Sequence, residues 1–133
     1  EGSEYETFDF SPLQKNQDEV IKISTLLKER KLKTAVYLGK DADESTFKKV
    51  NIQNFGIIHL ATHGFVNHGR ANLAGVAFAR NPSSEEDGIL YMDEIFSLHN
   101  RANLICLSAC ETGRGILQTG EGLIGLTRAF IYS

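Results

Sequence analysis

The spacing of apolar residues changes several times along the chain and predicts alternating helices and strands. Between residues 17 and 30, apolar side chains recur every three or four positions, after the capping-box pair Asn16 and Glu19, which predicts a helix. Two runs, 57–61 and 103–108, are almost continuously apolar. Such runs are typical of strands that are buried on both faces of a sheet.

Shorter patterns predict the remaining elements: strands at 34–38, 75–79 and 89–91, and helices at 43–50, 93–98 and from Glu121 onward. Asp43 and Thr119 are the expected caps of two of these helices. The strands at 75–79 and 89–91 flank a polar loop and predict a small hairpin that projects from the main sheet.

Together these elements predict an α/β domain with a mostly parallel central sheet and helices on both faces. The final helix is still apolar at helical spacing when the sequence stops, without a glycine cap or a polar tail. We therefore interpret residues 1–133 as a single domain that is incomplete at its C-terminal end.

Composition and charge narrow the classes of function. A chain of 133 residues can bury a core without a disulfide or metal, and its two cysteines are expected to be reduced thiols. The formal net charge of −3 comes from well-mixed charges, so we expect neither nucleic acid nor a membrane surface as a partner. No apolar stretch approaches the roughly 18 residues of a membrane span, and no signal peptide is visible, so we expect a cytoplasmic location.

Two chemically distinctive motifs follow the two buried strands. "HLATHG" at 59–64 places His63 just after the first strand, and "LSACETG" at 107–113 places Cys110 just after the second. If the strands are neighbours, their carboxyl ends lie about 5 Å apart, at the edge of the sheet where ligands bind. A nearby imidazolium lowers the pKa of a thiol and favours the nucleophilic thiolate. We interpret Cys110 as a nucleophile and His63 as its base, with the backbone N–H groups of Gly64 and Cys110 as an oxyanion hole.

The same residues allow less specific interpretations. Cys110 could simply fill space at a strand end, and Cys106 and His59 are expected to be core residues within the strands. His59 and His63 are four residues apart, and so are Cys106 and Cys110. On a helix this spacing could bind zinc. On a strand it separates two residues by about 13 Å, so no metal is expected. The acidic loop at 85–87 is expected to be solvated.

"HLATHG", "LSACETG" and "GEGLIGLTRAF" (120–130) resemble the CHAT domain, a caspase-like and separase-like cysteine peptidase module of clan CD that often follows tetratricopeptide repeats. The resemblance implies a caspase-like three-layer sandwich and a catalytic dyad of His63 and Cys110 that hydrolyses peptide bonds without a cofactor. It also implies protein or peptide substrates, and tetratricopeptide repeats in the same or a partner chain. Ser108 and Glu111 differ from the residues that flank the caspase cysteine, so caspase-like cleavage after Asp does not follow. A catalytically inactive module that serves as a protein-interaction scaffold is the alternative.

Overall fold

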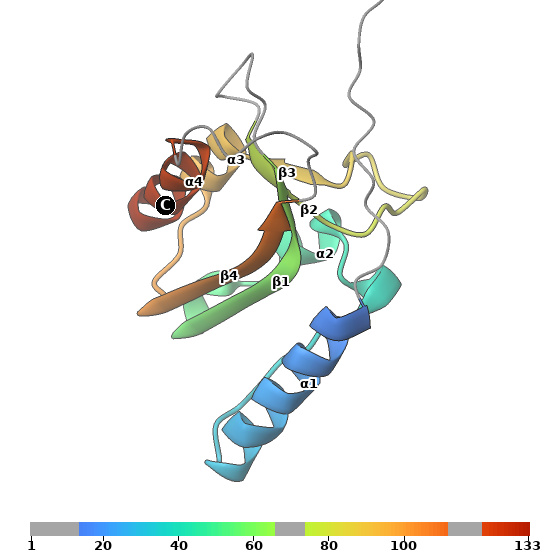
Figure 1. The fold of residues 1–133 in the computed structure, drawn as a ribbon, viewed down its shortest axis with the longest axis vertical. Helices are drawn as coiled ribbons and strands as arrows, with labels where there is room; N and C mark the ends of the chain where they lie inside the picture. The colour runs from blue at the N-terminus through green and yellow to red at the C-terminus, as the bar shows by residue number, and fades with distance from the viewer. Residues whose placement is uncertain (1–13, 66–73, 112–120) are drawn as a thin grey trace, which may run out of the picture.

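A computed structural model describes residues 14–65, 74–111 and 121–133 (Figure 1). These residues form four α-helices, which are α1 (Gln14–Glu29), α2 (Glu44–Lys49), α3 (Met92–Ser97) and α4 (Glu121–Tyr132). They also form four strands, which are β1 (Ile57–Phe65), β2 (Gly75–Ala77), β3 (Ile89–Tyr91) and β4 (Leu104–Glu111). Two short 3₁₀ helices also form: η1 (Gly39–Asp41) lies between α1 and α2, and η2 (Ile52–Asn54) lies between α2 and β1.

The strands make one sheet in the order β3-β2-β1-β4. β1 and β4 run parallel and are paired from Ile57 with Leu104 to Gly64 with Glu111. β2 runs antiparallel to both β1 and β3, and its pairing with β1 involves only Gly64 and Phe65 of that strand. The chain therefore forms an α/β fold.

The expectation of a mostly parallel sheet needs correction, because among the described strands one pairing is parallel and two are antiparallel. The predicted hairpin does form, and β2 joins it to the main sheet through the last two residues of β1. The reason lies in the connections. A short link is sufficient between antiparallel strands, whereas the parallel strands β1 and β4 are joined by a crossover that contains the hairpin and α3.

The core lies where β1, β2 and β3 meet α3 and α4. Its buried side chains include Leu60, Val76, Leu90, Ile95 and Phe130. α4 packs beside α3, while α1 lies on the other side of β1 and β4 in the view of Figure 1. Within the described ranges, the helices are too short or too polar to cross a membrane.

Most predicted elements form, with shifted ends. Asp43 caps α2, since its carboxylate accepts a hydrogen bond of 2.8 Å from the backbone N–H of Thr46. α1 begins at Gln14, so Asn16 lies inside the helix and is not its cap. α4 begins at Glu121 as expected, and its predicted cap, Thr119, lies outside the described residues.

The strand predicted at 34–38 does not form. This segment follows α1 as an irregular chain, and Leu38 has the extended backbone angles φ −132° and ψ 151°. Extended backbone becomes a stable strand only when a neighbour takes up its hydrogen bonds, and 34–38 pairs with no strand in the described structure. Instead, this segment and β1 line the same cleft.

Candidate active site

The central geometric feature of the site is the pairing of His63 with Cys110. These residues are Cα partners across the parallel pair formed by β1 and β4. Neighbouring strands lie about 4.8 Å apart, so the two backbones are close although their residues are far apart in the sequence. The side chain of Cys110 lies outside the described part of the structure.

The strand boundaries differ from the prediction at this point. His63 and Cys110 were expected just beyond the strand ends, at 61 and 108, but β1 continues to Phe65 and β4 to Glu111. β1 is longer because Gly64 still pairs with Glu111 of β4, and because Gly64 and Phe65 both pair with β2. Both residues therefore lie within the last three positions of a hydrogen-bonded strand, which fixes their backbones more firmly than a loop would.

His63 is buried, with 6% of its surface exposed, and it lines a cleft of about 490 Å³. The cleft is also lined by residues of 35–43 and of 77–79. A volume of this size is typical of a small-molecule or peptide side-chain site. His63 is thus placed in the wall of a cavity that could hold a ligand.

Glycines allow the strands beside His63 to approach closely. Gly64 is paired with Val76 on one side and with Glu111 on the other. A Cβ at Gly75 would lie 2.8 Å from the carbonyl oxygen of Leu90, which is closer than packed atoms normally come. The sheet therefore requires a residue without a side chain at Gly75.

A second polar group lies on the same two strands. His59 Nε2 is 2.8 Å from Glu19 Oε1, and the Ser108 hydroxyl donates a hydrogen bond of 3.1 Å to Glu19 Oε2. His59 was expected to be a core histidine with a satisfied ring, and its contact with Glu19 agrees with that interpretation. Cys106 is the register partner of His59 and is a half-buried free thiol.

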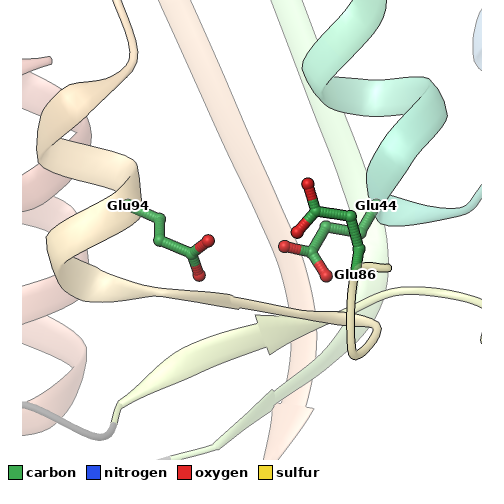
Figure 2. A group of neighbouring side chains, drawn as sticks. All are labelled: Glu44, Glu86 and Glu94. Carbon is green, nitrogen blue, oxygen red and sulfur yellow. The ribbon is translucent and has the colours of Figure 1, made fainter. Parts of the chain in front are cut away.

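Lys48 organises a separate cluster of carboxylates. Its ammonium lies 2.7 Å from Glu44, 2.8 Å from Glu86 and 2.6 Å from Glu94. Figure 2 shows these glutamates converging from α2, from the loop between β2 and β3, and from α3. The backbone N–H of Gly88 also donates to Glu44. The cluster therefore ties three segments together, and the loop at 85–87 is anchored through Glu86 and not only solvated.

The charged groups in this cluster shift one another's pKa values. Burial raises the pKa of Glu44, although hydrogen bonds from Lys48 and Gly88 partly oppose the rise. Burial alone would lower the pKa of Lys48, but hydrogen bonds to the three glutamates outweigh it and raise that pKa. The hydrogen bond from Lys48 lowers the pKa of Glu86. Three carboxylates this close could also ligate a cation, but here the Lys48 ammonium already bonds to each of them.

Sequence reasoning missed the roles of Glu19 and Lys48. A local signal existed for one contact, because Glu44 and Lys48 have the four-residue spacing of a helical ion pair. The contacts of Lys48 with Glu86 and of Glu19 with Ser108 join segments that are distant in the sequence, so no local pattern predicts them. His63 and Cys110 were predicted from the sequence because each follows an apolar run that predicts a buried strand, and their catalytic role stays a prediction.

Comparison with known proteins places the chain in a family. The family model described as the CHAT domain matches residues 2–133, which include both motifs and all the described elements. No curated protein and no solved structure matches the chain. Since the match covers almost the whole sequence, the chain belongs to the CHAT domain family.

Proposed function

We propose that this CHAT domain is a cysteine peptidase in which Cys110 is the nucleophile and His63 the general base. The observation that carries the proposal is the register of β1 and β4, in which these two residues are direct partners. A thiol and an imidazole held at the spacing of neighbouring strands have the residue types and the proximity that nucleophilic catalysis needs. The family and the cleft beside His63 support the same function.

In the proposed reaction, His63 takes the thiol proton of Cys110, and the thiolate attacks the carbonyl carbon of the scissile peptide bond. The tetrahedral intermediate collapses as the C–N bond breaks, and the imidazolium of His63 gives its proton to the leaving amine. Water, activated by the neutral imidazole, then attacks the thioester. The C–S bond then breaks, the acid product leaves, and the imidazolium returns its proton to the thiolate, so the cycle needs no cofactor.

The oxyanion of the tetrahedral intermediate needs hydrogen-bond donors. Backbone N–H groups of Gly64 and Cys110 are the proposed oxyanion donors. Gly64 has strand partners on both sides, Val76 and Glu111. Its N–H can donate to the oxyanion where neither strand ladder takes it as a donor.

The alternative function is an inactive module of this family that binds a protein partner as a scaffold. A peptide could bind a Cys110→Ala variant at equilibrium under either function. Covalent capture of a peptide electrophile by the wild-type protein, dependent on His63, is expected only of the enzyme. In the enzyme, we propose a protein or peptide substrate and regulation by tetratricopeptide repeats in the same or a partner chain.

The test is to treat the full-length protein with an electrophilic peptide probe at neutral pH and map the modified residue by mass spectrometry. The proposal predicts fast modification of Cys110 that is lost in His63→Ala. Cys106 in the same molecule is the internal control, because it lies on β4 four residues before Cys110. Slow labelling that does not depend on His63, or equal labelling of the two cysteines, would favour the scaffold.

A further inference from the structure

The carboxylate of Glu19 contacts both strands that carry the proposed dyad. One oxygen lies 2.8 Å from His59 Nε2 on β1, and the other accepts the hydroxyl proton of Ser108 on β4 at 3.1 Å. A single side chain of α1 therefore bridges the parallel pair. Hydrogen bonds to an ionised carboxylate are stronger than those between neutral groups, so this bridge restrains the two strands relative to each other.

The bridge lies immediately upstream of the proposed dyad. Ser108 is two residues before Cys110 on β4, and His59 is four residues before His63 on β1. Side chains two and four residues apart along a strand belong to the same face of the sheet. His59 and His63 thus share the face of β1 that Glu19 approaches.

Apolar packing attaches α1 only in part, because Val20, Ile23 and Leu27 are half-buried and none of them is fully buried. Ile21 and Leu26 are large apolar residues of this helix, yet 49% and 58% of their surfaces are exposed. Glu19 itself is half-buried, and it is not among the residues that line the cleft, although Asn16, Gln17 and Val20 of the same helix are. Glu19 does contact His59, which lines the cleft, so removal of its carboxylate would loosen the contact with the strands without removing a cleft-lining side chain.

We propose that Glu19 is a positioning residue for the pair formed by His63 and Cys110. Through Ser108 and His59 it holds the ends of β4 and β1 in the relative placement that proton transfer and attack require. This inference rests on the proposed function. Catalysis is sensitive to such placement, since a misplacement of about 1 Å can reduce a rate by roughly a hundredfold.

The test measures inactivation of the full-length protein by the peptide electrophile, separated into the maximal rate of labelling at Cys110 and the probe concentration that gives half that rate. Glu19→Ala and Ser108→Ala are each expected to lower the maximal rate about tenfold and to leave the half-saturating concentration unchanged. Ser108→Thr, which retains the hydroxyl, should restore the rate. The double variant should be no slower than Glu19→Ala, because both changes break the same bridge.

Asp18→Ala is the matched control, since Asp18 is an exposed carboxylate next to Glu19 on α1. Circular dichroism at the assay temperature gives the folded fraction by which each rate is divided. If Glu19→Ala does not fold, the rate of Ser108→Ala tests the role of the bridge, because this variant removes only a hydroxyl group. Rates within twofold of wild type, or an equal loss in Asp18→Ala, would overturn the role of Glu19. Labelling of the wild-type protein that does not need His63 would overturn the proposed function first, and this inference with it.

Discussion

His63 on β1 and Cys110 on β4 are direct partners in a parallel strand pair. The register is continuous from Ile57 with Leu104 to Gly64 with Glu111, so the relationship is set by a whole ladder of hydrogen bonds and not by one contact. His63 therefore lies on regular strand backbone in the wall of the cleft, and the backbone of Cys110 lies beside it.

Replacing Lys48 should destabilise the fold. In Lys48→Met, Glu44 would remain almost fully buried, with 2% of its side chain exposed, and would lose its cation. We expect a loss of about 2 kcal/mol in the free energy of unfolding, smaller than for a fully buried pair because Lys48 is partly exposed. Urea denaturation measures this loss. Lys49→Met, which changes an exposed neighbour, should cost less than about 0.5 kcal/mol, and equal losses in the two variants would contradict the role of the cluster.

The cost of Lys48→Met should depend on pH. Burial already raises the pKa of Glu44 above its ordinary value of 4.5, and removal of the Lys48 hydrogen bond should raise it further. When a carboxyl group has a raised pKa in the folded state, the folded protein becomes less stable as the pH rises through that pKa. Urea titrations from pH 4.5 to pH 7 should therefore show a larger loss at neutral pH. A loss that is constant across this range would show that the charge of Glu44 is not the cause.

Asp43 should contribute to stability at neutral pH and lose that contribution in acid. The Thr46 backbone N–H lowers the pKa of this carboxyl below 3.8, and further bonds from the Thr46 hydroxyl and the Asn81 amide oppose the effect of burial. Its stabilisation is therefore complete above pH 3.8 and is lost as the pH falls through the lower folded-state pKa. Asp43→Asn keeps a helix-capping oxygen, so its unfolding free energy should fall less steeply below pH 4 than that of the wild type. Slopes that coincide in a urea titration series would refute this.

Gly75 should not tolerate a side chain. An alanine Cβ at this position would lie 2.8 Å from the Leu90 carbonyl oxygen and 3.2 Å from the ring of Phe65, so β2 would have to move. We expect Gly75→Ala to lower the unfolding free energy by about 1–3 kcal/mol. Gly56→Ala is the matched control, because the nearest atom to its Cβ would be the Asn103 amide nitrogen at 3.8 Å. A thermal melt in which both variants unfold at the same temperature would contradict the close approach of the strands at Gly75.

The parts of this structure that sequence reasoning predicted are those with a local or periodic signal. β1 and β4 are continuous apolar runs, and the Asp43 cap has the residue type that helix starts favour. The segment 34–38 carries the same strand signal but pairs with no strand in the described structure, because pairing is a long-range event that composition does not determine.

The same distinction holds at the candidate site. The two motifs pointed to His63 and Cys110, because a reactive residue type followed each predicted buried strand. The bridge from Glu19 to Ser108 joins α1 to β4 across most of the chain, and only the fold brings these residues together. Likewise, the hairpin was predicted from its turn residues, whereas its place beside β1 depends on the pairing of Phe65 with Gly75.

The pH dependence of Cys110 alkylation tests the central claim most directly. A small electrophile such as iodoacetamide would be reacted with the full-length protein from pH 5 to pH 10, and the rate at each cysteine would be read by mass spectrometry. If His63 activates the thiol, the midpoint for Cys110 should lie well below the value of about 8.5 that is typical of a free cysteine, and it should return to about 8.5 in His63→Ala. A midpoint near 8.5 in both proteins would contradict the dyad.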